Sequence, residues 1–225
     1  MLKFIIENFS HVFPILLSGM FALVIVVERT AALVWTYNIA GFEPFIERVK
    51  MLVLKDRITE AIALCESYRS KPAARVVREG LMRANQPEQL IEHGLEIAVG
   101  DALEKINLRT AFLGTIANIA TLFGLLGTIV GLVQSFDAVG SANAQDRASL
   151  LAKGISVAMN ATMLGLGVAI PAMIAFSLLT NRANRLTAQV DSSAVRIKDL
   201  LKQRFFKVDP KLDVDNHPHK GIRHR

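Results

Sequence analysis

The sequence predicts an all-α, polytopic membrane protein with three transmembrane helices, the second and third extended into the cytoplasm, plus a helical cytoplasmic domain. Three stretches without Asp, Glu, Lys or Arg carry this prediction: residues 8–27, 110–136 and 154–181. Each is long enough to cross the hydrocarbon core of a bilayer, which needs about 20 apolar residues in a helix. A mean hydropathy of +0.36 agrees with this class.

Residues 1–38 are interpreted as a periplasmic N-terminus and the first transmembrane helix. A secretory signal peptide is the alternative, because Lys3 precedes an apolar core. No small-x-small cleavage motif precedes Glu28 and Arg29, and Trp35 and Tyr37 follow, which is typical of a membrane interface. We therefore interpret this segment as a retained helix.

The distribution of Lys and Arg predicts the orientation. Residues 36–110 contain eleven Lys and Arg, the segment after Asn181 contains eleven more, and residues 137–153 contain only Arg147 and Lys153. Since loops rich in Lys and Arg stay in the cytoplasm, the N-terminus and the 137–153 loop are expected to be periplasmic and the C-terminus cytoplasmic.

Residues 39–109 are expected to form a helical cytoplasmic domain. Ile58, Ile62 and Cys65 recur at helical spacing, and Pro72 suits the first turn of a helix. Residues 85–87, Asn-Gln-Pro, predict a break, after which residues 88–109 read as one helix that continues into the membrane. Eleven acids balance the eleven bases, so this domain is not a nucleic-acid-binding patch.

The second span, residues 110–136, carries an unusual set of polar and small residues. Thr121, Thr128 and Ser135 recur every seven residues, and Asn118 lies one helical step before Thr121. Polar groups in hydrocarbon are costly unless they face protein or water, so this stripe should not face lipid. Three glycines lie beside it and allow close backbone approach: Gly124, Gly127 and Gly131.

The third span, residues 154–181, follows a short periplasmic loop at 137–153 and has matching features. Its polar residues are Ser156, Asn160 and Thr162, and its small residues and proline are Gly165, Gly167, Ala169 and Pro171. The two spans are expected to pack together around a shared interior. Simple helix packing is the alternative, because Gly, Ser and Thr are common in membrane helices that line nothing.

The chain then continues as an expected cytoplasmic helix over residues 182–208, with apolar residues at near-helical spacing: Leu186, Val190, Val195, Ile197, Leu200 and Leu201. Residues 209–225 are expected to be a disordered polar tail. The net charge of +6 resides after Asn181, and anionic membrane lipid is its expected partner. His217, His219 and His224 are too sparse to predict a metal site.

No motif predicts an enzyme or a bound cofactor. The sequence lacks a phosphate-binding G-x-x-x-x-G-K-[ST] loop and zinc-ligand spacing, and single Cys65 forms no internal disulfide. Neither the second nor the third span holds an acid or a base. An ion path through them would need a titratable group from another chain, because hydroxyls solvate or relay a charge without storing it.

Three segments, one from each span, resemble a known family. "LFGLLGTIVGLVQSF", followed by "GISVAMNATMLGLGVAIPAMIAFSLLTNR", is similar to the MotA/TolQ/ExbB proton-channel family, and "PILLSGMFALVIVVERTAAL" looks like the first helix of its TolQ/ExbB branch. The motifs G-T-x-x-G and A-T-x-x-G-L-x-x-A-I-P are specific as a pair. Three spans rather than four favour the TolQ/ExbB branch.

The resemblance implies a location in the bacterial inner membrane and a homopentamer whose second and third helices line a pore. This pore would hold the membrane helices of two ExbD- or TolR-like subunits. The partner's membrane aspartate would supply the titratable group, and Thr128 and Thr162 would correspond to the family's pore-facing threonines. Ion flow would then drive rotation and mechanical work on the cell envelope, with a TonB- or TolA-like protein as a further partner.

One position departs from the family pattern. Many TolQ and ExbB proteins carry a glutamate five residues before the third-helix threonine, where this chain has Val157. A proton is the favoured ion, and sodium is the alternative, because Asn118 and Asn160 could coordinate it. Glu28, beside Arg29, is interpreted as a member of an interfacial ion pair.

Two other functions stay open from the sequence. A non-conducting scaffold would tolerate Val at Thr128 and Thr162. A solute transporter would need a pocket at mid-membrane, which broken helices or inverted repeats usually signal, and Pro171 is the only proline in the last two spans. The envelope process that receives the work depends on the partners rather than on this chain.

Overall fold

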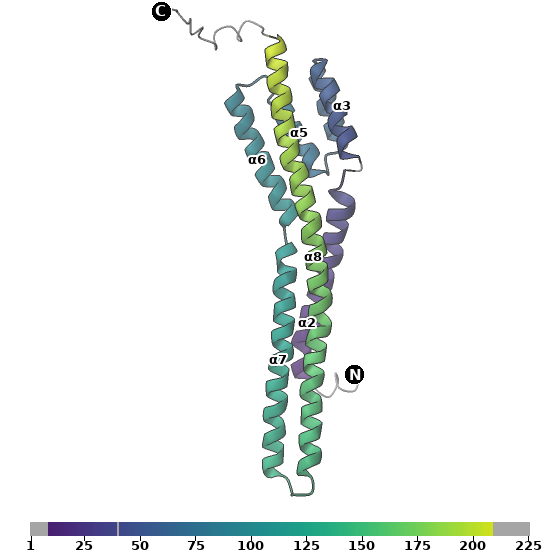
Figure 1. Cartoon of the computed structure of the whole chain (residues 1–225), viewed down its shortest axis with the longest axis vertical. Helices are drawn as coiled ribbons and strands as arrows, with labels where there is room; N and C mark the ends of the chain where they lie inside the picture. The colour runs from purple at the N-terminus through teal and green to yellow at the C-terminus, as the bar shows by residue number, and fades with distance from the viewer. Residues whose placement is uncertain (1–8, 40, 209–225) are drawn as a thin grey trace, which may run out of the picture. The chain divides into compact units, whose positions relative to one another are not determined.

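The computed structural model describes residues 9–39 and 41–208, and within them every regular element is a helix (Figure 1). The chain divides into two compact units. The membrane unit holds described residues up to Leu33 together with 107–182, and the polar unit holds described residues 34–106 and 183–208. The elements are α2 (Phe9–Thr30), the π-helix η1 (Ala31–Thr36), α3 (Phe42–Leu54), α4 (Ile58–Ser67), α5 (Pro72–Met82), α6 (Glu88–Asn107), α7 (Thr110–Ser141) and α8 (Arg147–Val208).

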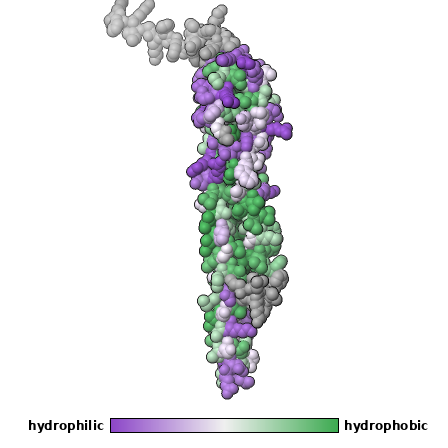
Figure 2. All heavy atoms as spheres, turned by 90° about the vertical axis from the view of Figure 1, so that its right-hand side faces the viewer, coloured by the Kyte–Doolittle hydropathy of each residue, from purple (hydrophilic) through white to green (hydrophobic). Residues whose placement is uncertain are grey.

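The three predicted transmembrane helices are confirmed. Segments long and apolar enough to cross a membrane lie within Val12–Thr36, Glu88–Ser141 and Arg147–Phe205. In the membrane unit many large apolar side chains point outward, among them Leu122 (62% exposed) and Leu178 (67% exposed). Figure 2 shows hydrophobic residues dominating this unit, while hydrophilic residues gather over the polar unit. An apolar exterior of this kind suits lipid contact.

Small side chains build the interface between α7 and α8, and larger ones attach α2. A Cβ on Gly19 of α2 would meet the Val168 side chain of α8 at 3.1 Å. Along α7, α2 shares an apolar groove lined by Pro14, Leu17, Ser18, Phe21, Ile25, Phe112, Ile116, Ile119 and Phe123. Among the described glycines, a Cβ would meet backbone of the facing helix at Gly124, Gly131 and Gly165 of the α7–α8 pair.

The polar unit buries a core of aliphatic residues from α3 to α6 and from the end of α8. Pro72 is at the start of α5, as the sequence predicts, since the missing amide of proline costs nothing at the first turn. α6 begins at Glu88, after the predicted break at 85–87. A Cβ on Gly80 would meet the side chains of Leu95 and Ile197 at 3.0 and 3.2 Å, so α5, α6 and α8 meet closely there.

The helix that leads into the second span is interrupted. α6 ends at Asn107 and α7 begins at Thr110, whereas the sequence predicts one uninterrupted helix. Arg109 has φ 60° and ψ −12°, a left-handed conformation that ends a right-handed helix. The helical stretch still extends from Glu88 to Ser141, but a two-residue break divides it.

The extension of the third span is continuous. α8 includes the third uncharged stretch and ends at Val208, and only residues 142–146 separate it from α7. Leu186, Val190, Ile197, Leu200 and Leu201 are buried as their spacing suggests, but Val195 is 61% exposed. The predicted tail at 209–225, with its histidines, lies outside the described residues.

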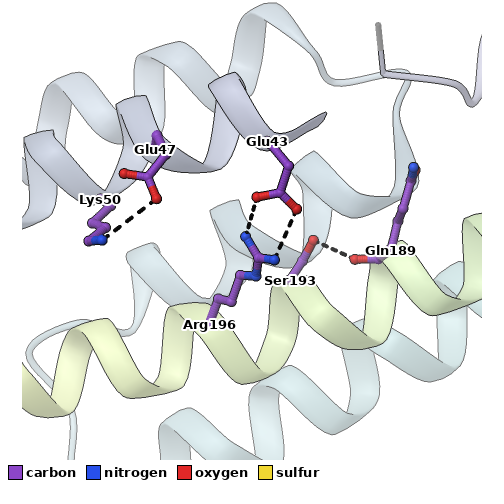
Figure 3. A network of polar contacts seen from close by, with 6 residues as sticks. All are labelled: Glu43, Glu47, Lys50, Gln189, Ser193 and Arg196. Carbon is purple, nitrogen blue, oxygen red and sulfur yellow. Dashed lines mark hydrogen bonds and ion pairs between the residues drawn. The ribbon is translucent and has the colours of Figure 1, made fainter. Parts of the chain in front are cut away.

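Ion pairs join α8 to the other helices of the polar unit. Arg196 donates two hydrogen bonds to Glu43 of α3, at 2.7 and 2.9 Å, while Glu47 pairs with Lys50 within α3 (Figure 3). The hydrogen bonds from Arg196 hold the pKa of the Glu43 carboxyl below its ordinary value. Lys198 and Lys202 likewise pair with Glu92 and Glu88 of α6.

Candidate functional site in the membrane unit

A small-residue seam joins α7 and α8; it consists of Gly124, Gly127 and Gly131 on α7 and Ala158, Ala161 and Gly165 on α8. A Cβ on Gly127 would lie 2.7 Å from the Ala161 Cβ, and one on Gly131 would lie 3.2 Å from the Ala158 Cα. These positions admit no larger residue without displacement of a helix. Backbone packing at this range is the usual use of small residues in membrane helices.

The contacts fix the register of the two antiparallel helices. Gly124 meets Gly165 and Gly131 meets Ala158, so each step forward along α7 is matched by one step back along α8. This register places Thr128 and Thr162 at the same depth. Two residues that the sequence associates only through a family motif thus come from facing helices at one level.

We call Thr121, Thr128 and Thr162 the hydroxyl edge, because all three flank the seam on the side away from α2. Residues of a helix turn by about 100° each, so Thr121 and Thr128 lie on one flank of the α7 glycines, whereas Ile116 and Phe123, which face α2, lie on the other. On α8, Val168 faces α2 and Thr162 lies on the opposite flank. The edge is partly exposed and has no helix of this chain packed over it among the described residues.

One hydroxyl of the edge reaches across the seam. Thr162 Oγ1 donates a long hydrogen bond of 3.4 Å to the carbonyl oxygen of Gly124. In an α-helix this carbonyl also accepts the amide of the residue four positions on, which is Thr128. Thr128 Oγ1 donates to Leu125 O at 2.6 Å and Thr121 Oγ1 to Ala117 O at 3.0 Å. Each hydroxyl therefore keeps its lone pairs for an ion, a water molecule or a partner group.

The remaining predicted site residues lie elsewhere. Ser135 is buried within the seam, donates to Gly131 O at 2.6 Å, and occupies the space where a Cβ on Gly154 would fall. Asn160 is two residues from Thr162 and therefore points about 200° away from it. Val157 is five residues before Thr162 and therefore points about 140° away from it, so it does not lie on the hydroxyl edge. The structure thus brings together three threonines, without Ser135 or Asn160.

Pro171 lies outside the seam. It is exposed on α8, and a Cβ on Gly167 would meet nothing within 4 Å. Proline has no amide hydrogen, so the Gly167 carbonyl receives no helix hydrogen bond from position 171. The helix continues through this position without interruption.

Glu28 forms the ion pair that its sequence position suggests, and a partner in this pair is Arg109. Arg109 Nη1 donates to Glu28 Oε2 at 2.8 Å, which joins the end of α2 to the break before α7. Arg29 is 1% exposed. The sequence does not identify this partner, because the paired residues are 81 positions apart.

The chain matches one family model, described as the MotA/TolQ/ExbB proton channel family, over residues 68–192. It is 30% identical to the Tol-Pal system protein TolQ of Haemophilus influenzae over 123 residues, 53% of this chain and 54% of that protein. It is 34% identical over 167 residues to a putative biopolymer transport protein ExbB homolog of Methanothermobacter thermautotrophicus, 67% of this chain and 59% of that protein.

A third relative is the biopolymer transport protein exbB1 of Vibrio cholerae, 30% identical over 127 residues, 56% of each chain. The matched region thus spans little more than half the length of each of these relatives. The family match contains the whole α7–α8 seam and all three threonines of the hydroxyl edge. With three membrane-spanning helices in the order that the resemblance requires, this chain belongs to the TolQ/ExbB branch of the MotA/TolQ/ExbB proton channel family.

Proposed function

We propose that this chain is the ion-conducting subunit of a TolQ/ExbB-type motor in the bacterial inner membrane, which uses the proton motive force to do mechanical work on the cell envelope. The observation that carries the proposal is the hydroxyl edge. Thr128 and Thr162 lie at one depth on facing helices; the Thr162 hydroxyl donates to the Gly124 carbonyl and the Thr128 hydroxyl to the adjacent Leu125 carbonyl. Polar groups left open at such a depth are costly unless they face water or protein.

The proposal requires a second subunit. The uncharged stretches 110–136 and 154–181 contain no group that could bind and release a proton. A single-span ExbD/TolR-like partner with a membrane carboxylate would supply that group, while Thr128 and Thr162 solvate the ion beside it. Several copies of α7 and α8, five by resemblance to the family, would surround the two partner helices. A TonB- or TolA-like protein would receive the work.

The position of the amides supports a proton over sodium. A sodium site needs several oxygen ligands at one point, and Asn160 faces away from Thr162. The three threonine hydroxyls alone provide too few oxygen ligands for a sodium site. The expected orientation, with the polar unit in the cytoplasm and the α7–α8 loop in the periplasm, agrees with the concentration of Lys and Arg at 36–110 and after Asn181.

Ion flux in proteoliposomes tests the proposal. This protein would be reconstituted with and without an ExbD/TolR-like partner, and flux would be measured in a proton gradient and in a sodium gradient. We expect proton flux only with the partner, a fall of about tenfold or more in Thr162→Val, and recovery in Thr162→Ser. Thr115→Val is the matched control, since Thr115 is exposed on α7 away from the hydroxyl edge.

Two results would contradict the proposal. Unchanged flux in Thr162→Val and Thr128→Val, with intact complexes, would remove the hydroxyl edge from the ion path. Absence of flux in both gradients, with the partner bound, would favour the non-conducting scaffold. Flux in the sodium gradient alone would support a motor of the same type that is driven by sodium instead of protons.

A further inference from the structure

The polar unit contains a charged cavity that the proposed motor does not use. It has a volume of about 140 Å³ and lies between α5 and α6, with Tyr37 and Ser70 at its margin. Its cations are Arg75, Arg83 and Lys105, and its carboxylates are Glu79 and Asp101. The remaining lining is small or apolar and consists of Pro72, Gly94, Ile97, Ala98 and Ala102.

The Arg83 side chain lines this cavity and occupies space that is free because Gly94 has no side chain. Its guanidinium lies against Gly94 of α6, where a Cβ would overlap Arg83 Nε, Cδ and Cζ. The Nε atom is buried and has no hydrogen-bond acceptor among the described residues. A buried guanidinium donor without an acceptor costs free energy, so a ligand whose acceptor draws the Arg83 guanidinium toward the cavity would remove that cost.

The charges of the lining indicate which ligand would fit. Three cations and two carboxylates leave a net charge of +1, and Glu79 already accepts from Arg78 Nη1 at 3.1 Å. A group with one negative charge and several acceptor oxygens would satisfy Arg83 without a large excess of negative charge. A phosphodiester meets both conditions, whereas a phosphomonoester carries about −1.5 to −2 at neutral pH.

The ends of the cavity are tied to the membrane helices through the chain. Tyr37 directly follows η1, and Lys105 precedes the start of α7 by five residues, a reach of roughly 18 Å at most. We infer that this cavity binds the monoanionic phosphodiester of a glycerophospholipid headgroup or of a soluble glycerophosphodiester, with Arg83 as its principal donor. This site is independent of the ion path along α7 and α8.

Calorimetric titration of the full-length protein in non-ionic detergent tests the site. The titrants are dihexanoylphosphatidylglycerol, glycerophosphoglycerol, glycerol 3-phosphate and uncharged dihexanoylglycerol. We expect Arg83→Gln to weaken binding of the phosphodiesters by about tenfold or more, the usual effect of losing a charged hydrogen bond. Gly94→Ala should act similarly, because it displaces the guanidinium and keeps its charge.

Arg57→Gln is the matched control, since Arg57 is an exposed cation of the same unit that pairs with Glu60 outside the cavity. Circular dichroism and protection of the buried Cys65 thiol verify the fold of each variant. Binding of the lipid but not of glycerophosphoglycerol would identify a membrane lipid as the source, and equal binding would identify a soluble one. Equal binding of dihexanoylglycerol, tighter binding of glycerol 3-phosphate, or equal losses in Arg57→Gln and Arg83→Gln would overturn the assignment.

Discussion

Gly124 and Gly165 pack backbone against backbone: a Cβ on Gly165 would lie 2.7 Å from the Gly124 Cα and 2.8 Å from the Ala120 carbonyl oxygen. Neither of these atoms belongs to a side chain that could rotate away. Any side chain at position 165 must therefore push α8 away from α7. The same displacement would separate Thr162 from the Gly124 carbonyl.

We expect Gly165→Ala to destabilise the membrane unit by about 1–3 kcal/mol, the usual cost of overpacking. Gly167→Ala is the matched control on the same helix, because a Cβ there meets nothing within 4 Å. Unfolding in detergent mixtures, followed by circular dichroism, measures the difference. Equal stability of the two variants would show that the seam opens without cost.

The Glu28–Arg109 pair and the left-handed backbone at Arg109 can be separated by substitution. Arg109→Ala loses the ion pair and keeps the strained φ, whereas Arg109→Gly loses the pair and relieves the strain. We expect the glycine variant to be the more stable of the two by about 1 kcal/mol. The free energies of unfolding of both variants give this difference directly.

The ion pair itself should contribute less than about 1 kcal/mol, because both side chains are substantially exposed. Glu28→Gln should therefore destabilise the wild type slightly and should have no effect in the Arg109→Ala background. An equal effect in both backgrounds would mean that Glu28 acts through a group other than Arg109.

Cys65 is the only cysteine of the chain and reports on the integrity of the polar unit. It is 1% exposed, and burial raises the pKa of its thiol to about 12 from 9.0. Because this pKa is raised, the thiol's contribution to stability is complete below pH 9 and is lost as the pH rises toward 12. At pH 8 we expect labelling by a thiol reagent to be slower than in the unfolded chain by roughly a thousandfold.

Ala63→Cys in a Cys65→Ala background is the control for labelling, since residue 63 is exposed on the same helix. It should react at the rate of a free thiol. Rapid labelling of Cys65 in the native protein would mean that α4 opens readily, and the α3–α5 packing would need revision.

The Glu43–Arg196 pair should make the polar unit sensitive to acid. The pKa of Glu43 lies below its ordinary value of 4.5, so its contribution is present above pH 4.5 and is lost as the pH falls through the lowered pKa. We expect wild type to have a slightly higher unfolding midpoint than Glu43→Gln at pH 7 and a smaller advantage at pH 3.

Glu60→Gln is the control, because Glu60 is an exposed carboxylate of the same unit that pairs with Arg57 rather than with Arg196. Its unfolding midpoint should follow that of wild type across the titration. A constant difference between wild type and Glu43→Gln at all pH values would show that the carboxylate acts through packing rather than through charge.

The features that the sequence predicts are those with a local signal. Uncharged length identifies the three spans, Pro72 marks the start of α5, and residues 85–87 mark the break before α6. The interruption at Arg109 has no such signal, because it depends on one left-handed residue and on an ion pair with distant Glu28. Helical periodicity alone therefore predicts one continuous helix across residues 108–109.

The candidate site shows the same limit. Thr121, Thr128 and Ser135 look like one stripe, but a repeat of seven residues drifts by about 20° per heptad on a straight helix. By Ser135 the drift has turned the hydroxyl into the seam, where it is buried against Gly154. Asn160 and Thr162 are close in sequence and point apart in space. The register of α7 against α8 decides which hydroxyls lie close together, and this register cannot be derived from the spacing of residues within one helix.

The chain passes between the two units three times, and the last two of these connections differ in helical continuity. α8 passes from the membrane unit into the polar unit as one helix of 62 residues, with neither Pro nor Gly after Pro171. The α6–α7 connection has a two-residue break that holds a left-handed arginine. If the proposed rotation applies torque to α8 within the bilayer, the continuous helix would transmit it with little bending. The non-helical residues 108–109 would let α6 and α7 change their relative angle without bending either helix.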